Sequence, residues 1–157
     1  MKSLRRPTVN MFIGRYQHTI DPKGRVSIPA RYRNALAQYE GNLIVVPDDD
    51  CLNVYPFEAW ERLVSTINEQ SRFDEEIRKL GRLWISLARE AELDSAGRVL
   101  LPPDSRQRAG LVKDVTLVGI GREFFEVWDR GRFEEYERMH GDGLRGSYAR
   151  LSQLGVK

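Results

Sequence analysis

Residues 21–29 read DPKGRVSIP, and residues 94–102 of the same chain read DSAGRVLLP. The offset between the two stretches is 94 − 21 = 73 residues. The same offset pairs Val45 with Val118, which indicates one register without gaps across both copies. Self-similarity at a fixed period is typical of a duplicated supersecondary unit, so the sequence predicts two copies of one fold unit.

Each copy is predicted to contain two strands joined by a glycine turn. In the first copy, alternating side chains over residues 12–20 predict a half-buried strand, and Lys23-Gly24 supplies the turn. Residues 25–28 form the returning strand, and the proline after them suits the first turn of a helix. The other expected elements are a helix over 30–37 and strands over 43–46 and 51–55, followed in the second copy by strands over 86–93, 98–101, 115–119 and 124–128 and a helix over 132–139.

Two amphipathic helical stretches are expected to connect the copies, the second one starting at Asp74 as its N-cap. A unit of about 50 residues buries too little apolar surface to be stable alone. Each copy must therefore pack against its sister, against another subunit, or both, and we predict an obligate oligomer. The expected organisation is a first unit over 11–58, connecting helices over 59–85, a second unit over 86–139, and flexible termini over 1–10 and 140–157.

The composition excludes some classes of protein. Of the 157 residues, 41% are hydrophobic and 31% are charged, which is typical of a globular protein and not of a disordered one. The net charge of +2 permits nucleic-acid binding without arguing for it. Cys51 is the only cysteine, so no disulfide can form within the chain, and a reducing cytoplasm is expected. The apolar runs are too short to span a bilayer, so we expect no membrane partner.

The repeated motif resembles the AbrB-like, swapped-hairpin DNA-binding domain, in which Asp-x-Lys-Gly-Arg-x-x-x-Pro joins a hairpin to a short helix. Two tandem copies in a chain of this size resemble the MraZ family of bacterial transcription regulators. The resemblance extends over residues 11–139 and includes Met11-Phe12-Ile13-Gly14 before the first motif and Phe125-Glu126-Val127-Trp128 after the second. It implies an α+β, mostly β fold, in which two tandem AbrB-like units form a pseudo-twofold, β-barrel-like core with peripheral helices.

The resemblance also implies a function. It predicts a sequence-specific DNA-binding regulator, acting as a repressor of its own division and cell-wall operon. The partner is double-stranded DNA with repeated promoter sites, bound by a ring-like homo-oligomer at the nucleoid. No cofactor is implied. Several weak contacts made at once would give such an oligomer high avidity for repeats of matching spacing.

The two copies differ in charge around the turn. Residues 21–33 carry four basic side chains and one acidic, 4 − 1 = +3, whereas residues 94–106 carry two of each, 2 − 2 = 0. Basic side chains on a rigid hairpin neutralise phosphates, and an arginine can also grip a guanine edge in the major groove. We therefore expect the first copy to make most of the DNA contacts. The predicted DNA-binding residues are Lys23, Arg25, Arg31, Arg33 and Arg98.

Structural interpretations of the same residues stay open at this point. An Asp four residues before an Arg around a turn can form an ion pair that only fixes the hairpin, and this applies to Asp21 with Arg25 and to Asp94 with Arg98 in equal measure. Arg15 is interpreted as a surface charge. The three tryptophans lie on apolar stripes or strands, which favours core packing over base stacking.

No enzyme is predicted. The two histidines lack Cys or carboxylate neighbours at metal-ligand spacing, and no phosphate-binding glycine loop or nucleophile elbow is present. We therefore predict no catalytic residue, no metal site and no cofactor. Two other functions compete with specific DNA binding: an oligomeric scaffold or protein-binding module, and an RNA-binding protein, which would need exposed aromatic side chains for stacking.

Overall fold

The computed structural model describes residues 10–156, so the predicted flexible terminus over 1–10 lies outside the described residues except for Asn10. In chain order the elements are β1 (Arg15–Thr19), β2 (Arg25–Ser27), α1 (Ala30–Leu36), β3 (Leu43–Pro47), β4 (Leu52–Pro56), α2 (Phe57–Asn68), α3 (Glu75–Leu83), the 3-10 helix η1 (Ile85–Leu87), β5 (Arg89–Ala91), β6 (Arg98–Leu100), α4 (Pro103–Ala109), β7 (Asp114–Gly119), β8 (Phe125–Asp129), α5 (Arg130–His140) and α6 (Leu144–Gln153). The predicted α+β class, with strands in antiparallel sheets, is confirmed.

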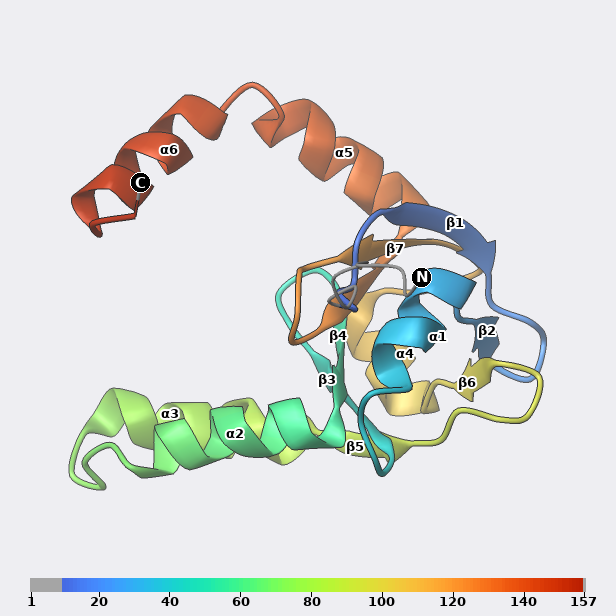
Figure 1. Ribbon diagram of the computed structural model, residues 1–157, viewed down its shortest axis with the longest axis horizontal. Helices are drawn as coiled ribbons and strands as arrows, with labels where there is room; N and C mark the ends of the chain where they lie inside the picture. The colour runs from blue at the N-terminus through green and yellow to red at the C-terminus, as the bar shows by residue number, and fades with distance from the viewer. Residues whose placement is uncertain (1–9, 157) are drawn as a thin grey trace, which may run out of the picture.

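The two copies exchange strands. A six-stranded sheet has the order β1-β7-β8-β4-β3-β5, and β2 pairs with β6 in a separate two-stranded ribbon. The first strand of each copy thus pairs with the other copy, β1 with β7 and β5 with β3, while β4 and β8 meet at the centre. If each strand is replaced by its equivalent in the other copy, the same order results, read from the opposite edge of the sheet. Each copy therefore completes the sheet of its sister, as the need for a packing partner predicted (Figure 1).

The expected barrel-like core is wrong. Over residues 10–156 the strands form two sheets with free edges and do not close into a barrel. The physical reason lies in β2 and β6, which are three residues each and pair with one another instead of bridging the edges of the larger sheet. Single bridges, Ile20 to Val26 and Leu93 to Val99, link each short strand to the chain before its turn.

The expected gap-free register is also wrong, at one strand. Val45 lies opposite Val54, and Leu117 lies opposite Val127, so Leu117 is the equivalent of Val45, at an offset of 117 − 45 = 72. The second copy has one residue fewer between its short helix and the following strand and one more in the next turn. Helix α4 ends at Gly110, in the left-handed conformation, which turns the chain sooner than the right-handed Ala37 does after α1.

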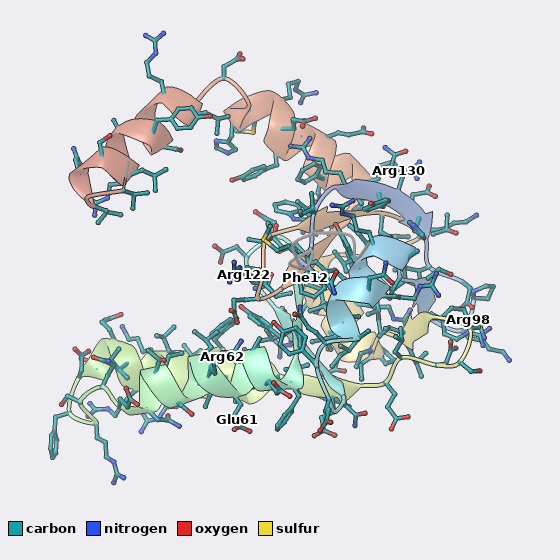
Figure 2. The ribbon with its side chains drawn as sticks, in the orientation of Figure 1. Phe12, Glu61, Arg62, Arg98, Arg122 and Arg130 are labelled. Atoms are coloured by element: carbon teal, nitrogen blue, oxygen red, sulfur yellow. The ribbon has the colours of Figure 1, made fainter. Side chains whose placement is uncertain are left out.

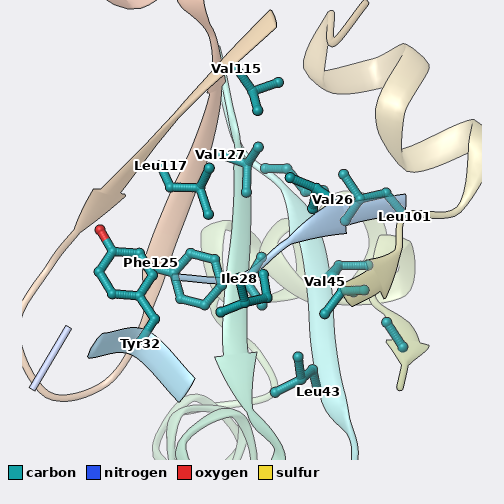
Figure 3. Packing of buried hydrophobic residues seen from close by; sticks show 14 of the residues in the cluster. Val26, Ile28, Tyr32, Leu43, Val45, Leu101, Val115, Leu117, Phe125 and Val127 are labelled. Carbon is teal, nitrogen blue, oxygen red and sulfur yellow. The ribbon is translucent and has the colours of Figure 1, made fainter. Parts of the chain in front are cut away.

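One hydrophobic core lies between the six-stranded sheet and the layer formed by α1, α4 and the β2–β6 ribbon (Figure 3). Both copies contribute to it, for example Val26 and Val99, which lie opposite one another in the ribbon and are buried. Tyr32 is fully buried there, and its hydroxyl donates to the backbone oxygen of Gly14. Sharing one core lets two small units reach the buried apolar area that neither has alone.

The opposite face of the sheet is covered by α2 and α5. Alternate residues of the strands point to this face, where Tyr55 packs against Trp60 and Trp128 packs against Phe133. The predicted core positions of Trp60 and Trp128 are confirmed. Trp84 is half-buried, its ring centroid lies 5.3 Å from that of Trp60, and its Nε1 donates to the oxygen of Pro47 at 3.0 Å.

Two helical arms project from the core on the same side, α2–α3 and α5–α6, and the β2–β6 ribbon lies at the other end of the molecule (Figure 1). Helix α6 was not predicted, because its Gly and Ser content lowers helix propensity. No residue of α6 is buried. The flexibility expected for residues 140–157 stays a prediction.

Gly119 and Gly81 are expected to respond oppositely to substitution by alanine. A Cβ on Gly119 would lie 2.3 Å from the backbone oxygen of Phe12, so Gly119→Ala must displace main chain and should lower the free energy of unfolding by about 3 kcal/mol. A Cβ on Gly81, inside α3, meets nothing within 4 Å, so Gly81→Ala should raise it by about 1 kcal/mol. Urea denaturation at one protein concentration measures both, and equal effects would contradict the predicted close approach.

Candidate nucleic-acid interface

The first hairpin turn is held by the carboxylate of Asp21. Its Oδ1 accepts hydrogen bonds from the backbone N–H groups of Lys23 and Arg25, each at 2.9 Å, and its Oδ2 accepts from Nε of Arg25 at 2.8 Å. The backbone oxygen of Asp21 also accepts from the N–H of Gly24. One aspartate therefore fixes both the turn and the direction of the Arg25 side chain.

The second turn repeats this arrangement. Asp94 accepts from the backbone N–H groups of Ala96 and Arg98, each at 2.9 Å, and from Nε of Arg98 at 3.1 Å. The expected ion pairs of Asp21 with Arg25 and of Asp94 with Arg98 are thus confirmed. These pairs engage only the Nε of each arginine, and the terminal nitrogens of Arg25 and Arg98 have no hydrogen-bond partner among residues 10–156. Each guanidinium is oriented by its Nε and keeps its outer edge for a ligand.

Acid is expected to loosen both turns. The N–H of Arg25 lowers the pKa of Asp21 below its ordinary 3.8, and the N–H of Arg98 does the same for the pKa of Asp94. A carboxyl group with a lowered folded-state pKa stabilises the fold above its unfolded pKa, and this contribution is lost as the pH falls through the folded value. The double variant Asp21→Asn/Asp94→Asn should therefore be less stable than the wild type at about pH 6 and equal to it near pH 2. Urea midpoints at both pH values test this, and a difference that persists at the lower pH would contradict it.

Arg33 and Arg106 occupy equivalent positions and cross between the copies. A Cβ on Gly97 would lie 3.0 Å from the Arg33 side chain, and a Cβ on Gly24 would lie 2.9 Å from the Arg106 guanidinium. Each arginine thus packs against the turn glycine of the opposite hairpin. Gly24 and Gly97 have φ of +88° and +78°, so they provide both the turn and the flat surface for the arginine.

The two hairpins share a groove of about 800 Å³ between the ribbon, β5 and the start of α4. Three acidic side chains, Glu90, Glu92 and Asp94, line it as well as five basic ones. We call this the cationic groove. Its basic side chains come from both copies: Lys23, Arg25, Arg89, Arg98 and Arg106.

The structure brings together three of the five predicted DNA-binding residues. Lys23, Arg25 and Arg98 line the cationic groove, and Figure 2 shows Arg98 at the end of the molecule away from the arms. Arg31 is exposed on α1 and does not line the groove, and Arg33 packs on Gly97 instead. The prediction that the first copy dominates stays a prediction, since the groove draws on both copies.

Sequence reasoning missed Arg89 and Arg106. Arg106 could have been found from its equivalence to Arg33 at the 73-residue offset. Arg89 could not be identified from the sequence, because it reaches the groove only through the pairing of β5 with β3 of the other copy. Its guanidinium forms an ion pair with Asp104 at 2.8 Å. Arg15, the surface charge, pairs with Glu137 and does not line the groove.

Within residues 10–156 there is no group of three or more His, Cys, Asp or Glu side chains placed to hold a metal ion. Over the same residues, none of the helices has the length and apolar character required to span a membrane.

Comparison with known proteins gives a consistent result. The family described as "MraZ protein, putative antitoxin-like" matches residues 11–83 and 85–153. A protein named transcriptional regulator MraZ from Thioalkalivibrio sulfidiphilus is 46% identical over 121 residues, covering 76% of this chain and 80% of its own length. Proteins of the same name from Acetivibrio thermocellus and Nitrosomonas eutropha are 34% and 44% identical, over 93% and 79% of this chain and 100% and 84% of theirs. The two matched segments each contain one copy of the repeat, and the chain therefore belongs to the MraZ family.

Proposed function

We propose that this protein is a sequence-specific DNA-binding transcription regulator that represses its own division and cell-wall operon. It acts in the cytoplasm, at the nucleoid, as a ring-like homo-oligomer bound to repeated promoter sites. The relatives named transcriptional regulator MraZ support the regulatory part of this proposal. The repressor role, the operon and the ring follow from the family resemblance.

The single observation that carries DNA binding is the cationic groove beside the β2–β6 ribbon. A two-stranded ribbon is narrow enough to enter the major groove of B-DNA, where base edges can be told apart. Arg25 and Arg98 stand on this ribbon, one from each copy, with their outer nitrogens free of partners among residues 10–156. Their Asp partners hold them in place, so little side-chain entropy is lost when DNA binds.

The ribbon also supports the proposed swapped-hairpin arrangement of two AbrB-like units. Each short strand pairs with its equivalent in the other copy, and Ile28 and Leu101 donate backbone hydrogen bonds to the turn glycines Gly97 and Gly24. Lys23, Arg25 and Arg98 are the proposed contacts within the cationic groove. Arg31 and Arg33 are proposed as phosphate contacts beside it.

Fluorescence anisotropy on the DNA upstream of the protein's own gene, against a scrambled duplex, tests the proposal across a salt series. The expected result is tight binding to the native fragment alone, with affinity falling steeply as salt rises because phosphate contacts release counterions. Equal, weak binding to both duplexes would overturn specific DNA recognition. That outcome would favour the oligomeric scaffold, for which the exposed apolar side chains of the two arms provide the supporting observation.

A further inference from the structure

A groove of about 850 Å³ runs along α3. We call it the α3 groove. Its apolar lining comes mainly from one helix face and includes Leu83, which is 71% exposed. The charged residues of the lining are Asp48 and Asp49 of the β3–β4 turn, Glu76 and Lys79 of α3, and Arg108 of α4. The apolar residues of the lining are Ile77, Leu80, Leu83, Trp84 and Leu87.

The α3 groove gathers five apolar side chains between charged residues. A contiguous exposed patch with polar residues at its rim marks a docking site more often than a free surface. The charges of Glu76 and Lys79 in its lining neutralise each other, because Nζ of Lys79 lies 3.0 Å from Oε1 of Glu76. Arg108 offsets one of the two aspartates, so three acidic and two basic side chains leave the groove with 3 − 2 = one net negative charge, which favours an occupant with basic side chains.

Helix α6 of the same chain has the matching character. Its apolar side chains recur at i, i+4 and i+7, which places Leu144, Tyr148 and Leu151 on one stripe. They are 54%, 64% and 43% exposed, and no residue of the helix is buried. The only charged residues in α6 are Arg145 and Arg150.

The duplication adds a second, independent argument. At the 73-residue offset α3 corresponds to residues 148–156, so α6 occupies the same place after α5 as α3 does after α2. Helices α2 and α3 lie side by side, whereas α6 diverges from α5 (Figure 1). The second arm therefore presents the apolar stripe of α6 without a partner among residues 10–156.

From these observations we propose that α6 of one chain docks in the α3 groove of a second copy, with its apolar stripe on the apolar lining and its two arginines, one on each flank of the stripe, complementing the net negative charge of the groove. The contact is head-to-tail, since one chain contributes the groove and the other contributes the helix. The first chain still has its helix, and the second still has its groove, for contact with a further copy. Such heterologous contacts generate a ring when the rotation closes and a filament when it does not. The inference rests on the oligomer in the proposed function and names the surfaces that form it.

Disulfide trapping between two differently tagged chains tests the docking. One full-length chain carries Leu83→Cys, the other carries Leu151→Cys, and both are co-expressed and mildly oxidised. The native thiol of Cys51 is buried, and burial raises its pKa, so it competes little for oxidation. The matched control replaces Leu151→Cys by Met139→Cys on α5, which is 68% exposed.

The expected result is a heterodimeric disulfide about tenfold more abundant than with the Met139→Cys control, because docking raises the effective concentration of the two thiols. No excess over the control would overturn the proposal. An intrachain disulfide in Leu83→Cys/Leu151→Cys, without any between chains, would also overturn it by showing that α6 folds back on its own groove.

A second measurement separates this proposal from DNA binding. Leu83→Asp and Leu151→Asp should each lower the mass of the oligomer in light scattering, and the affinity for a duplex with a single repeat should not change, because neither Leu83 nor Leu151 lines the cationic groove. An unchanged mass in both variants would overturn the docking. Trapping without any DNA binding would leave the docking supported and overturn the proposed function.

Discussion

Arg25→Ala is expected to lower the affinity for the protein's upstream DNA by about 100-fold or more. A well-placed arginine contact contributes about 1 to 3 kcal/mol, and an oligomer that engages several repeats loses one such contact at each of them. Anisotropy titrations at fixed salt measure the change. The oligomer should persist, since Arg25 lies on the ribbon and not on the arms.

Arg25 also holds its turn, so a loss of affinity needs a control for hairpin structure. Asp21→Asn provides it, because an amide oxygen can still accept the backbone N–H bonds of the turn while the ion pair at 2.8 Å is lost. If Arg25 contacts DNA, Asp21→Asn lowers the affinity far less than Arg25→Ala does, because the guanidinium is kept and only the ion pair that orients it is lost. Equal losses in both variants would show that Arg25 acts only through the turn.

Arg98→Ala completes the comparison. The second hairpin has Ala96 where the first has Lys23, so its contribution to phosphate neutralisation should be smaller. We expect Arg98→Ala to weaken binding clearly less than Arg25→Ala does in the same titration. An equal loss would overturn the unequal division between copies and assign the cationic groove to both hairpins alike.

Tyr32→Ala is expected to lower the free energy of unfolding by about 3 to 5 kcal/mol, as aromatic-to-alanine changes in a core do. The ring of Tyr32 is fully buried, and its centroid lies 4.8 Å from that of Phe125 and 5.7 Å from that of Phe12. The equivalent residue of the second copy, Ser105, is also buried but has no aromatic ring, so it cannot fill the space that loss of the Tyr32 ring would leave. Urea denaturation at one protein concentration measures the loss.

Tyr32→Phe is the matched control. It keeps the ring and removes the hydroxyl that donates to Gly14, which should cost about 1 kcal/mol. A Tyr32→Ala variant that is no less stable than Tyr32→Phe would contradict the placement of this ring at the centre of the core.

Local structure could be predicted from the sequence because it depends on local chemistry. The glycine after Lys23, the proline at position 29 and the helical stripe after Pro56 placed the first turn, α1 and α2. The 73-residue offset places β4 and β8 in equivalent positions, Leu52–Pro56 and Phe125–Asp129. These features involve residues close in the chain or identical in both copies.

The need for the two copies to pack together was predicted, but the order in which their strands pair was not, because strand pairing depends on contacts between residues far apart in sequence. The same limit applies to the cationic groove, which gains Arg89 only through the pairing of β5 with β3. The packing of Arg33 could not be predicted either, since a basic residue near a basic hairpin resembles a DNA contact whether or not it packs on the opposite glycine. Charge can be read from a sequence, but the direction of a side chain cannot.

Strand exchange has a consequence for synthesis of the chain. Arg15 lies opposite Val118, so the two paired residues are 118 − 15 = 103 positions apart. At about 5 to 20 residues per second, the ribosome produces the partner of β1 roughly 5 to 20 seconds after β1 itself. For that interval the nascent first copy has unpaired strand edges and an exposed half of the core, and chains on neighbouring ribosomes can pair with each other before either is complete. Because its contacts are so distant in sequence, the fold is expected to form late and slowly, and largely after translation.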